Sequence, residues 1–151
     1  MKKYLTLANV MKAAAFLFGF IAFFMMFANQ IYLELLGSRG YVKTDAMFDK
    51  DYGAWITFVG YLLILIASLG ACALVFLGLD AKMNKMLALI LSGVLILGAI
   101  FVFIEAGVVN GRLDTSAYHL AGGPIVAGIF AIIAGLALCA SEFVPDKNLM
   151  K

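Results

Sequence analysis

The feature that most constrains this chain is its series of long runs without a charged residue. No Asp, Glu, Lys or Arg occurs from Tyr52 to Leu79, from Met86 to Ile104 or from Leu120 to Ser141. An α-helix rises about 1.5 Å per residue, so about 20 apolar residues cross a hydrocarbon layer of about 30 Å. Each of these runs therefore predicts a helix that spans a membrane.

A fourth run lies near the N-terminus. The stretch from Ala13 to Ala28 carries no charge, and flanking apolar residues extend it to about 11–33. A cleaved signal peptide is the alternative, because Lys2 and Lys3 precede the apolar stretch. The sequence Met26-Phe27-Ala28 has no small residue at the −3 position of a cleavage site, which favours a retained helix.

The composition excludes several classes of protein. Hydrophobic residues make up 65% of the chain, charged residues 13%, and the mean hydropathy is +1.06, whereas soluble domains have about 25% charged residues. The 11 basic and 9 acidic residues give a formal charge of +2 without a clustered basic stripe, which argues against nucleic acid as a partner. Two cysteines are too few for a disulfide scaffold.

We therefore predict an all-α, polytopic membrane protein with one domain, 1–151, folded as an antiparallel bundle of four transmembrane helices. The helices are expected at about 11–33, 53–79, 86–109 and 120–141. The short connection from Leu79 to Lys85 makes the second and third helices antiparallel neighbours. The first outer connection, from Glu34 to Ala54, is longer and is expected to form a partly ordered cap.

Lys and Arg residues predict the orientation, because cytoplasmic loops carry an excess of them. The side with both termini and the connection between the second and third helices holds seven, and the other side holds four. The first set is Lys2, Lys3, Lys12, Lys82, Lys85, Lys147 and Lys151, and the second is Arg39, Lys43, Lys50 and Arg112. We expect a multi-pass protein of the plasma membrane with both termini in the cytoplasm.

Small residues mark a helix-packing stripe in the last run. They recur every four residues, which places them on one face of a helix: Gly123, Ala127, Ala131, Gly135 and Cys139. Helices in a bilayer associate where small residues let their backbones approach. The first helix is the opposite case, because its many phenylalanines cover every side and some must face lipid or another protein.

The polar residues near the outer ends of the helices form the candidate site. Glu105 is an ionisable residue inside the third expected helix, 86–109, and an ionisable residue within a membrane segment is a functional hypothesis by default. Asn29, Gln30, Glu34 and Arg112, with Thr57 and Tyr61, are expected at a similar depth or just beyond it, as an outer polar vestibule. The alternative is a set of interfacial side chains that satisfy one another.

Other reactive residues do not form recognisable sites. The only histidine, His119, has no Cys, His or carboxylate near it at a metal-ligand spacing. Asp45, Asp49 and Asp51 resemble a fragment of a calcium loop without its remaining ligands. Cys72 and Cys139 do not form a CxxC pair. We therefore expect no catalytic residues, no metal and no cofactor.

This chain lacks the motifs of three families of small four-helix membrane proteins. Claudin-like tetraspans carry a Trp-Gly-Leu-Trp signature and two cysteines in their first outer loop, which are absent between Glu34 and Ala54. The Glu-Arg and Asn motif of the glutathione-linked eicosanoid enzymes is missing from the second helix. The first helix has no membrane-embedded Glu of the kind that small multidrug exporters need.

The chain resembles instead small four-helix membrane proteins of low-GC Gram-positive bacteria and their wall-less relatives. The resemblance lies in the Met1-Lys-Lys start, in Ala22-Phe-Phe-Met-Met-Phe27 and in the Gly- and Ala-rich stretch from Ala121 to Ala137. It covers the first and fourth helices. It implies a bacterial plasma membrane and carries no assigned activity.

Three functions remain open from the sequence. The first is a non-enzymatic scaffold or accessory subunit of a larger or homo-oligomeric membrane assembly, with lipid and other membrane subunits, or further copies of the chain, as partners. The second is a small channel or transporter whose pathway runs between protomers. The third is an immunity or envelope-stress protein.

Overall fold

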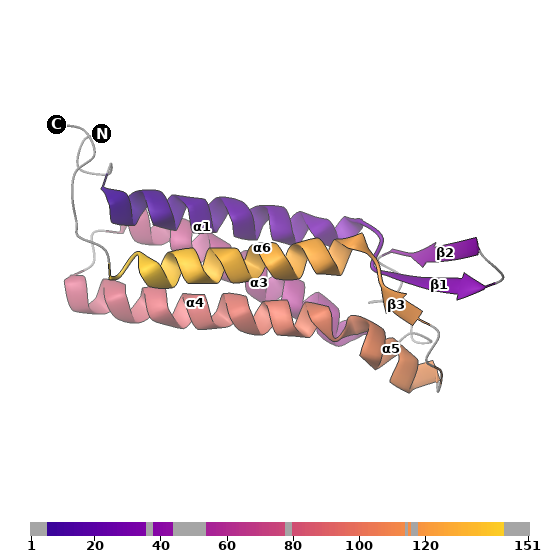
Figure 1. The fold of residues 1–151 in the computed structure, drawn as a ribbon. Helices are drawn as coiled ribbons and strands as arrows, with labels where there is room; N and C mark the ends of the chain where they lie inside the picture. The colour runs from indigo at the N-terminus through magenta and orange to yellow at the C-terminus, as the bar shows by residue number, and fades with distance from the viewer. Residues whose placement is uncertain are drawn as a thin grey trace.

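The structure is a computed structural model that describes residues 6–35, 38–43, 54–77, 80–113, 115 and 118–143. Its helices are α1 (Leu7–Phe24), the short 3-10 helix η2 (Met25–Phe27), α3 (Trp55–Phe76), α4 (Ala81–Phe103), α5 (Glu105–Leu113) and α6 (Gly122–Ala140). Its strands are β1 (Ile31–Leu35), β2 (Ser38–Val42) and β3 (Tyr118–Leu120). Figure 1 shows the long helices side by side, with the strands at one end. We call this the sheet end, and the end where α1 begins and α6 ends the terminal end.

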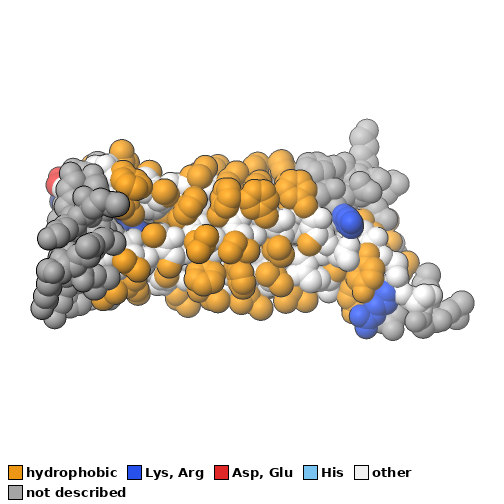
Figure 2. Space-filling view, turned by 90° about the horizontal axis from the view of Figure 1, so that it is seen from above, with side chains coloured by type: hydrophobic (Ala, Val, Ile, Leu, Met, Phe, Trp, Pro, Cys, Tyr) orange, Lys and Arg blue, Asp and Glu red, His pale blue; other side chains and the backbone are white. Residues whose placement is uncertain are grey.

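Four helical segments in the described residues are long and apolar enough to cross a membrane. They are Leu7–Phe27, Trp55–Phe76, Lys82–Leu113 and Gly122–Ala140. Figure 2 shows hydrophobic side chains along the length of one face, with Lys and Arg side chains toward the ends. Exposed apolar side chains come from all four segments, for example Leu17, Ile66, Ile100 and Leu136. A mostly helical molecule with four potential spans is therefore confirmed.

Small residues bring the helices close together. Both α1 and α4 pack against α3 and α6. A Cβ atom added to Gly60 of α3 would lie 3.0 Å from the Gly98 carbonyl oxygen, and one added to Gly98 of α4 would lie 2.9 Å from the Gly60 carbonyl oxygen. Real Cβ contacts are rarely this short, so glycine at both positions permits the close contact of α3 with α4.

The predicted first helix, 11–33, is wrong at both ends. The α1 helix begins at Leu7, where Thr6 caps it by accepting a hydrogen bond from the Asn9 N–H at 3.1 Å. The α1 helix ends at Phe24 and η2 ends at Phe27, and residues 31–33 belong to strand β1. The Gln30 side chain turns back and donates to the Met25 and Met26 carbonyls at the end of the helical segment, before the apolar residues 31–33.

A three-stranded antiparallel sheet joins the two connections at the sheet end. The strand order is β2-β1-β3, and Tyr32 of β1 pairs with Tyr41 on one side and with His119 on the other. The all-α prediction did not include this sheet, and Leu120, expected to begin the fourth helix, lies in it. Residues 44–53 of the expected cap lie outside the described residues.

The third predicted helix, 86–109, is two helices in the structure. The α4 helix begins at Ala81, because Asp80 caps it by accepting from the Met83 N–H at 2.7 Å. It ends at Phe103, and α5 continues from Glu105 to Leu113. Hydropathy did not indicate that α4 begins before residue 86, because Lys82 and Lys85 interrupt the apolar run. Both residues occupy exposed positions of the helix. The other two helices agree more closely with their predicted ranges, because α3 and α6 begin and end within a few residues of 53–79 and 120–141.

Candidate functional site

Polar side chains are buried at three levels of the bundle in the described residues. Two lie at the terminal end, two in the middle and three at the sheet end: Lys12 and Ser141, then Ser68 and Ser92, then Gln30, Thr57 and Glu105. Buried polar groups are costly unless they are hydrogen-bonded. At each level, these side chains therefore need hydrogen-bond or ion-pair partners.

In the middle of the bundle, backbone carbonyls satisfy both hydroxyls. Ser68 Oγ donates to the Ile64 carbonyl oxygen at 2.6 Å, and Ser92 Oγ donates to the Gly135 carbonyl oxygen at 2.7 Å. Gly19 of α1 faces the Ser68 side chain so closely that a Cβ there would overlap it. The two hydroxyls thus take part in helix packing.

At the sheet end, Gln30 connects the end of the first helical segment to α3. Its Nε2 group donates to the carbonyl oxygens of Met25 at 2.8 Å, Met26 at 3.0 Å and Ala28 at 3.0 Å. Its Oε1 atom accepts from the Tyr61 hydroxyl at 2.8 Å. Both ends of this fully buried amide therefore have partners.

Glu105 is buried at the same end of the bundle, without a hydrogen-bond partner among the described residues. Its side chain is 0% exposed, and neither carboxylate oxygen has a hydrogen bond within the part of the chain that the structure describes. The Tyr61 hydroxyl and the Glu105 carboxyl interact electrostatically. The Thr57 hydroxyl is buried in the same region and also has no partner there.

Helix geometry places these residues at one level of the bundle. Thr57 and Tyr61 are four residues apart and share the buried face of α3. A Cβ on Gly60 would lie 3.4 Å from a methyl group of Val102, so these turns of α3 and α4 face each other. Thr57 lies one turn from Gly60 and Glu105 one turn from Val102, both toward the sheet end because the two helices are antiparallel.

The predicted vestibule residues have different places. Gln30 and Glu105 are brought together with Tyr61 in the buried cluster. Asn29 is half-buried, and its carbonyl oxygen accepts from the Gly123 N–H at 2.8 Å. Arg112 is exposed at the far end of α5, and Glu34 lies in β1 opposite Arg39. The sequence placed Tyr61 at this depth but gave no sign that it bonds Gln30.

The helix-packing stripe of α6 lies inside the bundle. Gly123, Ala127, Ala131 and Gly135 are buried, and Cys139 is half-buried. A Cβ on Gly123 would meet the Asn29 carbonyl oxygen at 2.6 Å, and one on Gly135 would meet the Ser92 carbonyl oxygen at 3.2 Å. The stripe therefore contacts the end of the first helical segment at one level and α4 at another.

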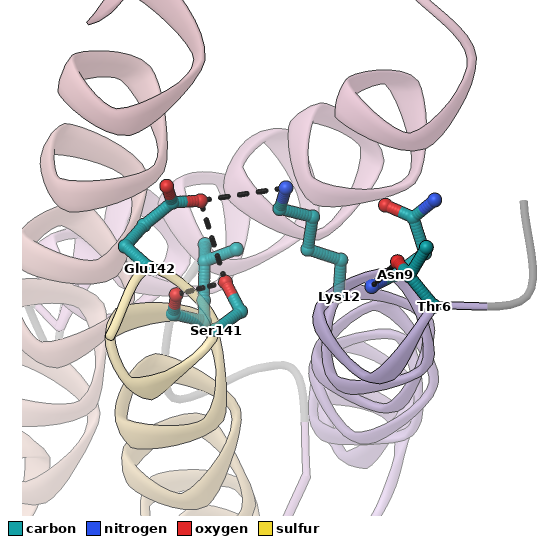
Figure 3. A network of polar contacts seen from close by, with 6 residues as sticks. Thr6, Asn9, Lys12, Ser141 and Glu142 are labelled. Atoms are coloured by element: carbon teal, nitrogen blue, oxygen red, sulfur yellow. Dashed lines mark hydrogen bonds and ion pairs between the residues drawn. The ribbon is translucent and has the colours of Figure 1, made fainter. Parts of the chain in front are cut away.

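A buried ion pair closes the terminal end, as Figure 3 shows. Lys12 Nζ of α1 lies 3.4 Å from Glu142 Oε1, just beyond α6, and the two side chains are 4% and 10% exposed. Ser141 Oγ donates to the Leu138 carbonyl oxygen beside them at 2.6 Å. From the sequence, Lys12 indicates only the topology, because no local pattern links it to Glu142, which is distant along the chain.

The remaining candidates do not add a site. Within the described residues, no group of three His, Cys, Asp or Glu side chains could hold a metal ion, and Cys72 and Cys139 are free thiols. The His119 ring lies beside the Tyr32 ring in a tilted arrangement, with ring centroids 5.3 Å apart. Asp45, Asp49 and Asp51 lie outside the described residues.

Comparisons with protein-family models, with curated proteins and with solved structures each give no match for this chain.

Proposed function

We propose that this protein is a non-enzymatic membrane subunit, a scaffold or accessory component of a larger or homo-oligomeric assembly. It crosses the plasma membrane four times with both termini in the cytoplasm, as its basic residues favour. Its partners are the lipid bilayer and either other membrane proteins or further copies of the chain.

The observation that carries this proposal is the outward face of the first helical segment. Four of its phenylalanine rings form a continuous row, with centroids 5.4 Å apart for Phe16 and Phe20, 4.8 Å for Phe20 and Phe24, and 6.4 Å for Phe24 and Phe27. Phe24 and Phe27 are 48% and 57% exposed. Aromatic rings dominate the energetics of many interfaces, since they provide large contact areas and defined ring geometries.

The opposite face of α1 supports the same proposal. Ala15, Gly19 and Ala22 are buried against the rest of the bundle. The helix thus packs its small residues, with Phe18 and Phe23, against the rest of the bundle, whereas Phe24 and Phe27 of the first helical segment are exposed. The middle of the bundle is filled by close helix contacts, which leaves the outer surface as the place for a partner.

Photocrosslinking in native membranes tests the proposal. A benzoylphenylalanine in place of Phe24 should give a discrete protein adduct, either with a second copy or with another membrane protein. The same group in place of Ile129, which is 47% exposed on α6, is the matched control and should react with lipid. Lipid adducts alone at both positions would contradict a partner on this face.

A small channel or transporter is the second candidate, and the unpartnered carboxyl of Glu105 favours it. Its pathway would have to reach a side chain that is fully buried inside one bundle. Purified protein in liposomes provides the test. Solute flux that Glu105→Gln abolishes would replace the scaffold proposal.

A further inference from the structure

The buried carboxyl of Glu105 is the least compensated group in the described part of the molecule. Burying an ionised carboxylate without a partner is strongly unfavourable, whereas a bound cation or a proton compensates it. The neighbouring Gln30 amide has partners on both its oxygen and its nitrogen. Glu105 has no hydrogen bond to any described residue, although it lies at the same end of the bundle.

Two hydroxyl groups, those of Thr57 and Tyr61, are buried at the same end of the bundle as Glu105. Thr57 Oγ1 is fully buried and has no hydrogen bond to the described residues. The Tyr61 hydroxyl uses its hydrogen to bond Gln30 Oε1, so its oxygen can still accept. Helix packing sets Thr57 and Glu105 at one level, and Tyr61 interacts with the carboxyl electrostatically.

We propose that Glu105, Thr57 and Tyr61 form a binding site for a monovalent alkali cation, with sodium as the first ion to test. Carboxylate and hydroxyl oxygens suit hard cations, whereas transition metals favour the nitrogen and sulfur ligands of His and Cys. One carboxylate balances one positive charge. A divalent ion would leave an uncompensated charge in the core.

The bound ion would join three parts of the fold. Thr57 and Tyr61 belong to α3, and Glu105 begins α5. Tyr61 in turn bonds Gln30, which holds the end of the first helical segment. Sodium should therefore stabilise the folded bundle, because a ligand that binds only the native state raises the unfolding temperature with its concentration.

Thermal unfolding of the protein in lipid nanodiscs, followed by circular dichroism, is the first test. Sodium chloride is titrated against choline chloride at constant ionic strength. We expect a saturable rise in Tm of about 5 °C or more with sodium and none with choline. An equal rise with potassium also supports an alkali-cation site. Equal Tm values in sodium and choline, or a response to calcium or magnesium alone, would overturn it.

Variants locate the effect. Glu105→Gln keeps the shape of the side chain and should abolish the sodium-dependent rise in Tm. Thr57→Val removes one ligand and should weaken sodium binding about tenfold, whereas Thr57→Ser should retain it. Glu142→Gln is the matched control at the opposite end of the bundle, and it should lower Tm but keep the sodium-dependent rise. A rise that persists in Glu105→Gln would overturn the assignment.

Direct binding of ²²Na⁺ to the wild-type protein keeps the test independent of whether a variant folds. Saturable binding of about one ion per chain supports the site, and its absence overturns it. Neither result changes the proposed partner face on the first helical segment, which crosslinking at Phe24 tests separately.

Discussion

A few polar side chains connect the helical segments at the two ends of this bundle. At the sheet end, the Gln30 amide binds three carbonyl oxygens and the Tyr61 hydroxyl. At the terminal end, the Lys12 and Glu142 side chains form a nearly buried ion pair. A buried polar group that loses its partner costs more than the bond itself contributed, so truncating one member of either set should be strongly destabilising.

Gly123 is the residue that leaves room for Gln30. A Cβ there would lie 2.6 Å from the Asn29 carbonyl oxygen and 2.8 Å from Gln30 Nε2. We expect Gly123→Ala to lower the free energy of unfolding by about 1 to 3 kcal/mol through overpacking. Gly122→Ala is the matched control, because a Cβ on this exposed neighbour would meet nothing within 4 Å. Chemical unfolding in detergent measures both, and equal losses would contradict the tight contact.

The Lys12 and Glu142 pair allows a second prediction at this scale. Lys12→Met leaves the Glu142 carboxylate buried and unpaired, which should cost on the order of 3 kcal/mol. Adding Glu142→Gln removes the unpaired charge, so the double variant should be more stable than Lys12→Met alone. Thermal unfolding of the two variants checks this order. If the second substitution brings no recovery, the two side chains do not interact as the structure has them.

At the scale of the elements, α6 shows which parts of the fold follow from sequence. Its small residues recur every four positions, and this period places them on one buried face. Strand β1 could not be predicted in this way, because Ile31, Tyr32 and Leu33 continue the apolar stretch, while the Gln30 side chain bonds the carbonyls at the end of the first helical segment. Period and hydropathy therefore predict helix faces, but not contacts between distant residues.

The candidate site is also only partly predictable, because its contacts join residues that are distant in the sequence. Depth along the helices predicts Gln30 and Glu105 at a similar level, because both lie near the ends of apolar runs. Their connection through Tyr61 depends on how α1, α3 and α5 pack, and no local pattern encodes it. Arg112 lies two turns beyond Glu105 and is exposed, so similar predicted depth did not mean proximity.

The stripe of α6 carries the prediction at this scale. Ala131→Leu and Gly135→Leu place a bulky side chain at buried positions and should each cost about 1 to 3 kcal/mol. Ile129→Leu and Ile133→Leu, which are 47% and 40% exposed, should be nearly neutral. The buried variants should lower the melting temperature in detergent without altering the oligomeric state, because the stripe packs within one chain. Similar melting temperatures for all four variants would contradict this packing.

At the scale of the whole molecule, the bundle has two unlike ends. The sheet, α5 and the Glu105 cluster lie at one, and the Lys12 and Glu142 pair lies at the other. The beginning of α4 lies at the terminal end too, because Lys85 Nζ lies 5.3 Å from the Phe143 ring centroid. Four spans would hold these two ends on opposite sides of a membrane.

Cysteine-accessibility labelling tests this arrangement most directly. Single cysteines replace the exposed residues Lys43 and Lys85 in a chain whose native Cys72 and Cys139 are changed to Ala. With a membrane-impermeant maleimide on intact cells, Lys43→Cys should be labelled, and Lys85→Cys should be labelled only after the membrane is permeabilised. Labelling of both positions from the same side would contradict a four-span bundle with its sheet and its terminal end on opposite faces of the membrane.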